Sequence, residues 1–324
     1  MRLRLFYPIA ILFLVAYFFY RLVSFLQIFF EHTGISITQQ EIKIAHATIP
    51  DSRPQYIPKI IHNVFHDWKN QSMPADWKKN RQNCIDLNPD WEHKLWSEEE
   101  SRVFIEEHYH WFLRAYDGYE HRVQRIDALR YFLLRNYGGI YLDLDNGCLE
   151  SLEPLLYYPI FTTDGGRGAL SNNILGSYPH HPFWKLLTES LIPYDHNYLF
   201  PYVTISYASG QWFETAIWDK YHHSIGGQAN GEENLENLLY RIMMDDRPGA
   251  EPWIFFTQER GGSWNNWDNR MFLWIGDHLA LDIMVGVSCI GLLLWCFKQC
   301  ARSCIRKCPV QKDCSKVRSV EFFA

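Results

Sequence analysis

The segment spanning residues 120–145 constrains the fold more than any other part of the chain. Residues 120–136 carry apolar side chains at helical spacing, and Gly138-Gly139 ends this pattern. Residues 140–144 (IYLDL) then have the character of a buried strand. A helix followed at once by a buried strand is a repeating element of α/β folds.

Earlier segments extend the same alternation of strand and helix. Residues 59–65 (KIIHNVF) and 91–96 (WEHKLW) have the composition of strands, and residues 74–88 between them have helical spacing. Ser97 is followed by three glutamates, which is typical of a capped helix start. The alternation predicts an α/β fold with a Rossmann-like sheet.

The composition suits a large folded domain. Of the 324 residues, 47% are hydrophobic and 21% are charged, so the chain can bury a sizeable core. The net charge is −6 although both ends are basic, which leaves the middle of the chain strongly acidic. Nucleic-acid binding requires a basic footprint, so the charge distribution argues against nucleic acid as a partner.

Apolar runs with basic flanks lie near both ends. The first covers residues 5–30 and is interrupted by Arg21; the second covers residues 279–297 and is interrupted by Asp282. About 20 apolar residues cross a bilayer as a helix, so both runs predict membrane spans with cytoplasmic tails. The alternatives are a cleaved signal peptide for the first run and a buried core helix for the second.

These runs divide the chain into five predicted parts. The α/β domain is expected to lie in a lumen between a polar stem and the second span. The parts are residues 1–30 (cytoplasmic tip and anchor), 31–54 (stem), 55–277 (lumenal α/β domain), 278–297 (second span) and 298–324 (basic, cysteine-rich cytoplasmic tail).

The eight cysteines fall into two groups. Cys84 and Cys148 lie in the middle of the chain and could pair in an oxidising lumen, although the sequence does not show pairing. The other six lie in or after the second apolar run and form no Cys-x-x-Cys pair. Juxtamembrane S-acylation is therefore favoured for them over a zinc site.

The main candidate site is an acidic pair at the end of the buried strand. Asp143 and Asp145 stand two residues apart after an otherwise apolar run. If the strand reaches residue 144, both carboxylates point the same way at the sheet edge where α/β sheets bind ligands. Close carboxylates repel unless a cation lies between them, and Mg²⁺ or Mn²⁺ would suit them and bridge to a diphosphate. The alternative is a solvated turn.

Asp127 and Arg130 form a second charged pair, one helix before the strand. At positions i and i+3 they share a helical face. We expect them to reach over the sheet edge to phosphate or sugar hydroxyls, because the guanidinium fork binds two oxygens of a diphosphate. The alternative is a surface ion pair of little energetic value.

Taken together, the motifs resemble the family-32 glycosyltransferases, which are sugar transferases with an Asp-x-Asp motif. The resemblance spans roughly residues 55–270, and the flanking apolar runs make it most similar to the catalytic subunits of fungal mannosyl-phosphorylinositol-ceramide synthases. The motifs are IPKIIHN (57–63), NPDWEHKLW (88–96), DALRY (127–131), YGGIYLDLD (137–145), SNN (171–173), HPFW (181–184) and GSWNNWD (262–268).

The resemblance implies a GT-A fold, sugar transfer with retention of configuration and a divalent cation, with Mn²⁺ favoured. Asp145 would bind the metal directly, and Asp143 would serve both metal and ribose. Arg130 would lie near the leaving diphosphate, with Asp127 on the donor sugar. The implied catalytic set is Asp127, Arg130, Asp143 and Asp145; the implied nucleotide-sugar site is His62, Asp127, Arg130, Tyr141, Asp143, Asn172, Asn173, Ser263 and Trp264; and the implied metal site is Asp143, Asp145 and Asn265.

Three places depart from the family pattern. Asn172-Asn173 stands where the family has Asn-Asp, Gln211 ends a Ser-Gly-Gln triplet where the family has Thr-Gly-Pro, and Asn265 stands for a closing histidine. An asparagine can ligate a metal through its carbonyl but brings no charge. A shifted acceptor, weaker donor binding or an altered activity would each be consistent with these changes.

The resemblance also implies function, partners and location. It implies a Golgi membrane enzyme of sphingolipid metabolism that moves mannose from GDP-mannose to inositol phosphorylceramide at the bilayer, with a regulatory membrane subunit as a further partner. The alternative enzyme is a hexosyltransferase acting on protein N- or O-glycans. The alternative outside enzymes is a non-catalytic membrane subunit that retains the fold, and the intact acidic motif argues against it.

Overall fold

The computed structural model describes most of the chain between residues 32 and 278. The described stretches are residues 32–48, 53–67, 72–166, 168–225, 238–245, 249–258 and 267–278, with short pieces between 13 and 30 and between 281 and 299. The chain divides into two compact units, Met1–Asn265 and Asn266–Ala324. Both sheets belong to the first unit, and α10 (Trp267–Asp277) belongs to the second.

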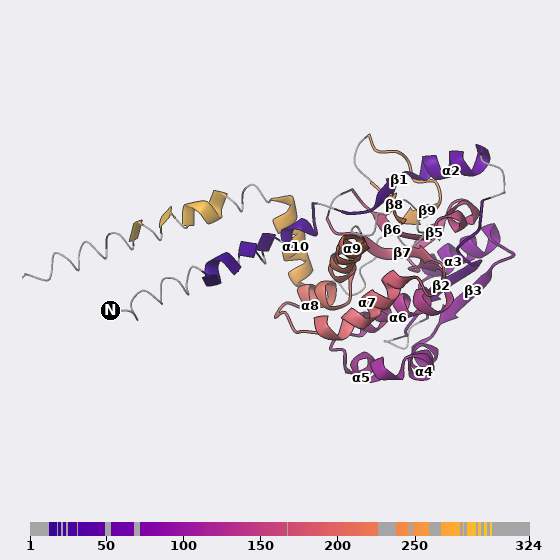
Figure 1. Ribbon diagram of the computed structural model, residues 1–324, viewed down its shortest axis with the longest axis horizontal. Coiled ribbons are helices and arrows are strands. Elements are labelled where there is room, and N and C mark those ends of the chain that lie inside the picture. The colour runs from indigo at the N-terminus through magenta and orange to yellow at the C-terminus, as the bar shows by residue number, and fades with distance from the viewer. Residues whose placement is uncertain are drawn as a thin grey trace, which may run out of the picture. The chain divides into compact units, whose positions relative to one another are not determined.

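A seven-stranded sheet forms the centre of the first unit, with the strand order β1-β8-β6-β7-β4-β2-β3 (Figure 1). Its neighbours pair in parallel except at β7, which runs antiparallel to both β4 and β6. This parallel-rich mixed sheet confirms the predicted α/β class. The strands are β1 (Ile35–Ile37), β2 (Ile60–Val64), β3 (Glu92–Trp96), β4 (Gly139–Leu142), β6 (Ile160–Asp164), β7 (Ser171–Ser177) and β8 (Leu239–Met243).

The sheet separates two apolar cores. Along β4 the side chains alternate, so that Tyr141 lies in one core while Ile140 and Leu142 lie in the other. The Tyr141 core is built with α6 and α7, and the opposite core includes Cys84 of α3. The helices are α2 (Gln39–Thr48), α3 (Ala75–Leu87), α4 (Glu98–His108), α5 (His110–Gly118), η1 (Glu153–Tyr157), α6 (Arg122–Tyr137), α7 (Pro182–Tyr194), α8 (Pro201–Ala208) and α9 (Gln211–Ile225).

The helix–strand unit at the centre of the sequence argument is confirmed. α6 ends at Tyr137, and β4 begins two residues later. Gly138 and Gly139 have φ angles of 64° and 90°. A Cβ at Gly138 would lie 2.6 Å from the Pro179 nitrogen, and one at Gly139 would lie 2.7 Å from the Ile60 carbonyl oxygen. Only glycine fits both the left-handed backbone and the space, so this pair stops the helix where the strand must start.

The predicted helix start at Ser97 is also confirmed. The Ser97 side chain accepts a hydrogen bond from the Glu100 backbone N–H, and the Glu100 carboxylate accepts one from the Ser97 N–H. This reciprocal capping box satisfies two N–H groups that the first turn of α4 would otherwise leave unpaired.

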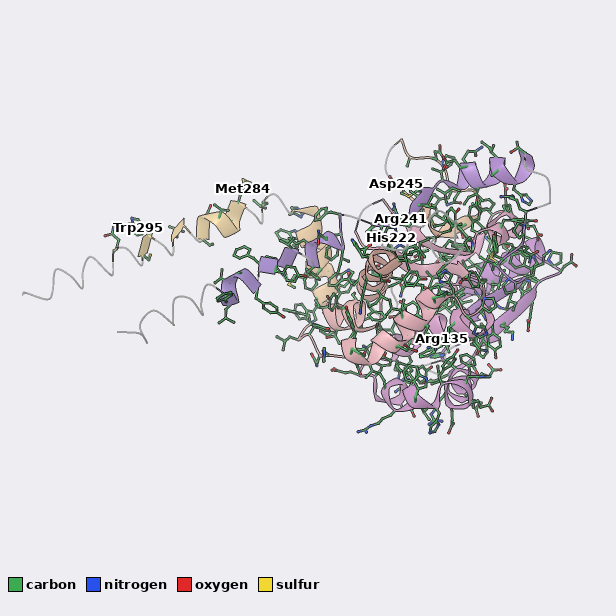
Figure 2. All side chains as sticks on the ribbon, in the orientation of Figure 1. Arg135, His222, Arg241, Asp245, Met284 and Trp295 are labelled. Carbon is green, nitrogen blue, oxygen red and sulfur yellow. A yellow bond between two sulfur atoms is a disulfide. The ribbon has the colours of Figure 1, made fainter. Side chains whose placement is uncertain are left out.

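Residues 31–54 differ from the polar stem expected from the sequence. They contain β1, which pairs in parallel with β8, and α2. His32 also bonds to Asp164 at the end of β6, with 2.9 Å between Nδ1 and Oδ2. Arg241 of β8, which is labelled in Figure 2, pairs with the same carboxylate. The segment is therefore an edge of the domain. Its single short strand carries too few alternating residues to be recognised without its partner 200 residues away.

The prediction of two membrane spans, and with it the predicted Golgi membrane location, is contradicted. Within the described residues, no helix is both long and apolar enough to cross a bilayer. At the end of the first run, Phe25 and Phe29 instead pack against Trp212, with ring centroids 5.4 and 5.1 Å away. This packing is confined to the end of the run, because the large apolar side chains described between residues 13 and 23 are exposed. The predicted tail, residues 298–324, lies outside the described part except for one residue.

Candidate active site

The Asp-x-Asp pair lies in a turn rather than in the strand. β4 ends at Leu142, and the Asn146 N–H donates to the Asp143 carbonyl oxygen at 3.0 Å, which closes a turn. The expected extension of the strand to residue 144 is therefore wrong. The chain must turn here because it leaves the large sheet and enters β5 (Asn146–Cys148), which pairs with β9 (Phe256–Gln258) in a separate small sheet.

Arg130 brings the helix pair and the turn together. Its Nη2 lies 3.0 Å from Asp127 Oδ1, and its Nη1 lies 3.4 Å from Asp143 Oδ2. The same Nη1 donates to the Asn172 carbonyl oxygen at 2.5 Å, and the guanidinium stacks 4.7 Å from the centre of the Tyr141 ring. The Arg130 side chain is only 4% exposed. The structure thus places this arginine between two carboxylates and not on a surface.

Asp127 is held by neutral donors as well as by Arg130. Asn172 Nδ2 donates to Oδ1 at 3.1 Å, and Ser209 Oγ donates to Oδ2 at 3.2 Å. Burial raises the pKa of Asp127 to about 6, against the opposing effect of the Arg130 charge. Both carboxylate oxygens are therefore occupied by the protein itself.

Tyr141 of β4 and Asn173 of the neighbouring strand β7 hold the turn in place. The Tyr141 hydroxyl donates to Asp143 Oδ1 at 2.5 Å. The Asn173 carbonyl oxygen accepts from the Asp143 N–H at 2.9 Å, and its side-chain Nδ2 donates to Asn146 Oδ1 at 3.1 Å. The Ser171 hydroxyl donates to Asn173 Oδ1 at 2.6 Å. An aspartate at position 173 could not donate to Asn146, so this departure from the family pattern fits the surrounding bonds.

Asp145 and Asp143 fit a divalent cation. Asp145 Oδ1 is buried and has no hydrogen-bond partner within the described residues. Burial, and then the charge of Asp143, raise the pKa of Asp145 to about 7, against the opposing effect of the more distant Arg130 charge, so one arginine does not offset two carboxylates. No group of three His, Cys, Asp or Glu suited to a metal occurs in the described part of the chain. Two carboxylates do not fill the coordination shell of a divalent cation, so such an ion would need further oxygen ligands.

The other predicted site residues have different placements. His62 is fully buried in β2, where one ring nitrogen lies 3.0 Å from the Gly138 carbonyl oxygen and the other accepts from Trp96 Nε1 at 3.2 Å. Burial lowers the pKa of His62 to about 4. The ring therefore lies at the start of β4, whereas the acidic turn follows its end. The predicted residues Ser263, Trp264 and Asn265 lie outside the described residues.

Sequence reasoning did not assign roles to several residues of the cluster. The Tyr131 hydroxyl donates to the Ser209 carbonyl oxygen at 2.9 Å and accepts from Asn172. Glu214, fully buried on α9, accepts from the Thr162 hydroxyl at 2.9 Å, and burial raises the pKa of Glu214 to about 7. The sequence does place an acid, Glu214, in an apolar helical stretch, and this could have marked it as a candidate. No local pattern, however, predicts that Glu214 lies close to α6.

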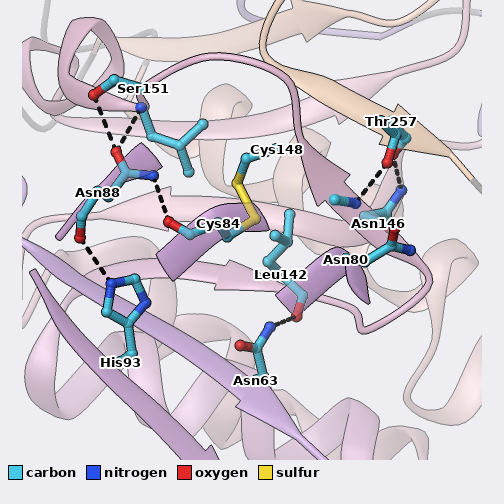
Figure 3. The surroundings of a disulfide bond; sticks show 12 residues. Asn63, Asn80, Cys84, Asn88, His93, Leu142, Asn146, Cys148, Ser151 and Thr257 are labelled. Atoms are coloured by element: carbon cyan, nitrogen blue, oxygen red, sulfur yellow. Dashed lines mark hydrogen bonds between the residues drawn. A yellow bond between two sulfur atoms is a disulfide. The ribbon is translucent and has the colours of Figure 1, made fainter. Parts of the chain in front are cut away.

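A disulfide ties the acidic turn to α3 (Figure 3). Cys84 pairs with Cys148, three residues after Asp145, so the pairing that the sequence left open is present. Asn63 Nδ2 donates to the Leu142 carbonyl oxygen at 2.7 Å. Asn80 Nδ2 donates to the Leu144 carbonyl oxygen at 3.4 Å. Because the carbonyl groups before and within the turn are fixed from β2 and α3, its path is determined by the scaffold.

Comparison with known proteins shows the family of the chain. Residues 74–161, which include all four predicted catalytic residues, match the family described as "Glycosyltransferase sugar-binding region containing DXD motif". Inositol phosphoceramide mannosyltransferase 2 of Schizosaccharomyces pombe is 38% identical over 244 residues, which cover 74% of this chain and 68% of the relative. The chain belongs to this family of Asp-x-Asp glycosyltransferases.

Two further members of the glycosyltransferase family are of similar closeness. Mannosyl phosphorylinositol ceramide synthases CSH1 and SUR1 of Saccharomyces cerevisiae are 37% and 36% identical, over 74% and 73% of this chain. The chain spans 61% and 60% of their lengths. Among solved structures, a chain named PaToxG Glycosyltransferase matches with a TM-score of 0.41 and 17% identity, covering 59% of this chain and 76% of that one. That likeness is too weak to bear on the fold.

Proposed function

We propose that this glycosyltransferase moves mannose from GDP-mannose to inositol phosphoceramide, with retention of configuration. The relatives whose names include mannosyl transfer to this lipid support the donor sugar and the acceptor. We also propose a GT-A fold, supported by the antiparallel β7 beside the strand that leads into the Asp-x-Asp turn. The observation that carries the proposal is that Arg130 forms ion pairs with both Asp127 and Asp143 at the carboxyl end of β4.

The acidic turn is the proposed diphosphate end of the site. Asp143 and Asp145 would hold a divalent cation, with Mn²⁺ favoured by family resemblance. When bound, such an ion would neutralise charge on the leaving diphosphate. Tyr141 fixes one oxygen of Asp143, and Arg130 lies beside the other. The chain therefore presents Asp143 in one orientation before any ligand arrives, which lowers the cost of ordering the site.

The buried side of the site, around Arg130 and Asp127, is proposed to orient the donor sugar. Arg130 keeps Asp127 and Asp143 in fixed positions, and Asn172 links Asp127 to Tyr131. His62 would act indirectly, by supporting the start of β4 through its bond to Gly138. Ser263, Trp264 and Asn265 remain proposed contacts to the nucleotide and the metal on the basis of the family resemblance alone.

The test is transfer by the purified full chain. It is incubated with a panel of GDP- and UDP-sugars, with inositol phosphoceramide as acceptor, in Mn²⁺, in Mg²⁺ or in excess chelator. The expected result is mannosylated lipid from GDP-mannose, an α-anomer by NMR, and loss of product in chelator. Full turnover in chelator would refute the cation site, and transfer to protein glycans but not to lipid would support the alternative enzyme.

Two controls separate the remaining readings. Asp145→Asn should give folded protein without product. A parent protein that is folded yet inactive with every donor would support the non-catalytic reading of the fold. Adding a candidate regulatory subunit then tests whether activity requires a second chain, and full activity of the chain alone would remove that proposed partner.

A further inference from the structure

Asn146 is the first residue after the Asp143–Asp145 turn, and it is buried, with 1% of its surface exposed. Its backbone N–H closes the turn on the Asp143 carbonyl oxygen. Its side-chain Oδ1 accepts a hydrogen bond from Asn173 Nδ2 of β7 at 3.1 Å. Its Nδ2 donates to the carbonyl oxygen of Thr257 in β9 at 3.1 Å (Figure 3). One amide therefore joins strands of both sheets at the point where the turn ends.

The two neighbours of this side chain require an amide between them. Asn173 Nδ2 is a donor and the Thr257 carbonyl oxygen is an acceptor, so the group between them must offer one acceptor and one donor. An ionised aspartate has no donor, and an apolar side chain would leave both groups unpaired in a buried place. The bonds on either side of Asn146 are therefore directional, and they fix the orientation of its side chain.

The small sheet depends on such side-chain bonds, because β5 and β9 have three residues each. Two strands of that length form only a marginal pair by themselves. Next to Asn146, the Gly147 N–H donates to Thr257 Oγ1 at 2.8 Å. A Cβ at Gly147 would lie 2.8 Å from the same oxygen, so glycine allows the strands to approach this closely. Consecutive residues after the turn thus both bond to Thr257.

The direction of the Asp145 carboxylate follows from the path of the backbone. Asp143 accepts a hydrogen bond from the Tyr141 hydroxyl, which holds its side chain. Asp145 Oδ1 has no hydrogen-bond partner within the described residues, and its carboxylate is bonded to its own backbone N–H. The backbone is tied before Asp145 by one long bond from α3, of 3.4 Å, and after it by the three shorter bonds of Asn146.

We propose that Asn146 is a positioning residue for the divalent cation. By joining β7 to β9, it sets the direction in which Asp145 presents its unpaired oxygen to the ion. This inference rests on the proposed function, because it presupposes a cation at Asp143 and Asp145. Removing a group that orients metal ligands typically lowers metal affinity by about 10–100-fold. A purely structural Asn146 would affect stability and leave the cation affinity unchanged.

Asn146→Ala and Asn88→Ala form a matched pair for the test. Asn88 is also 1% exposed; its Nδ2 donates to the Cys84 carbonyl oxygen at 3.0 Å, and its Oδ1 accepts from the Leu152 N–H at 2.9 Å. Each change removes a buried amide that bonds on both sides, but none of the bonds described for Asn88 reaches the turn. Both side chains are labelled in Figure 3.

Thr257→Val is a second variant at the same end of the turn. It removes the hydroxyl oxygen that accepts from the Gly147 N–H, and it keeps the carbonyl group that Asn146 uses. Because valine has nearly the shape of threonine, this variant should fold even if Asn146→Ala does not.

The experiment measures the Kd for Mn²⁺ of each full-length protein, with GDP present and no sugar donor, from the EPR signal of free Mn²⁺. The Tm is measured in parallel. Asn146→Ala should raise the Kd by about 10–100-fold. Thr257→Val should raise it by less, and Asn88→Ala should lower the Tm while keeping the Kd of the parent. In transfer assays, saturating Mn²⁺ should restore most of the turnover of Asn146→Ala.

A parent-like Kd in folded Asn146→Ala would overturn the inference, as would a parent-like Kd in Thr257→Val if Asn146→Ala does not fold. An equal rise in Asn88→Ala would also overturn it, because the effect would then follow from lost stability. A parent that binds no Mn²⁺ with GDP would refute the proposed cation site, and the inference with it. The expected changes of Kd in a protein that transfers no mannose would refute the proposed reaction alone and support the role of Asn146.

Discussion

The two halves of the candidate site contain the same kinds of residue in opposite settings. Around Arg130 and Asp127, side chains are 4% and 7% exposed, and the Asp127 carboxylate oxygens are bonded to protein groups. At the turn, the Asp143 side chain is 29% exposed, and Asp145 Oδ1 has no partner among the described residues. The comparison indicates that the carboxylate on the helix side of the site, that of Asp127, is paired within the protein, whereas Asp145 at the turn keeps a carboxylate oxygen for a ligand to pair.

Arg130→Ala should have the largest effect. Removing this cation leaves Asp127 buried without its ionic partner, which typically costs about 3–5 kcal/mol of the free energy of unfolding. That expectation differs from the small loss that a surface ion pair would give. Chemical denaturation measures it, with Arg125→Ala as the control, because Arg125 lies on the same helix but pairs with Glu98 at a more exposed site. A loss in Arg130→Ala no greater than in Arg125→Ala would remove the distinction between the two halves.

Asp145→Asn should reduce activity without reducing stability. Losing one preorganised charge contact in a transferase site typically lowers the rate by about 10²–10³-fold. The variant should be as stable as the parent or slightly more so, because it removes a carboxylate that burial and Asp143 already disfavour. Steady-state kinetics and thermal unfolding test both parts. A stability loss comparable to that of Arg130→Ala would show that the Asp145 carboxylate stabilises the fold, as the charges around Arg130 do.

The double variant Cys84→Ser/Cys148→Ser tests whether the scaffold reaches the turn. The disulfide joins residues 64 positions apart, so its loss should lower the free energy of unfolding by about 2–4 kcal/mol. The Mn²⁺ concentration for half-maximal activity should also rise, because β5 begins at the end of the acidic turn. Cys289→Ser, a free and exposed cysteine, is the control. Unchanged Mn²⁺ dependence in folded double variant would separate the disulfide from the site.

Sequence reasoning worked best where the signal is local. The period of α6, the stop at Gly138-Gly139 and the cap at Ser97 each depend on residues within one or two turns, and each is confirmed. The Asp143–Asp145 pair was found, but its conformation was not. Whether a chain continues as a strand after Leu142 depends on β9, more than 100 residues later, with which β5 pairs.

Local patterns do not report partners that are distant in sequence. β1 gains its pairing from β8, and hydropathy predicts a polar linker there because it does not include the partner strand. The burial of Arg130 was not predicted for the same reason. Helical spacing predicts that Arg130 lies beside Asp127, but it does not predict the hydrogen bond from Arg130 to the Asn172 carbonyl oxygen.

Glu214→Gln should give the smallest effect. It tests whether water reaches the buried side chains around Arg130 and Asp127, the helix side of the site. Burial, opposed by the Thr162 bond and the Arg130 charge, raises the pKa of Glu214 from 4.5 to about 7. The folded protein therefore keeps this proton over a pH range in which the unfolded chain has lost it, so stability falls as pH rises from about 4.5 to above 7. Glutamine carries no such proton. Above pH 7.5 the variant should be more stable than the parent by at most about 3 kcal/mol, and below pH 4.5 the difference should vanish.

Asp127 and Arg130 face the same interior as Glu214 and are present in both proteins, so the difference between the two stability–pH curves isolates Glu214. The Thr162 hydroxyl keeps an acceptor in the variant, because the amide oxygen replaces the carboxylate oxygen. Denaturation at a series of pH values measures both curves. Parallel curves would mean that water reaches Glu214 and holds its pKa near the ordinary value. The helix side would then be accessible to water, as the acidic turn is. The two parts of the site would differ only in how many of their carboxylate oxygens are hydrogen-bonded within the protein.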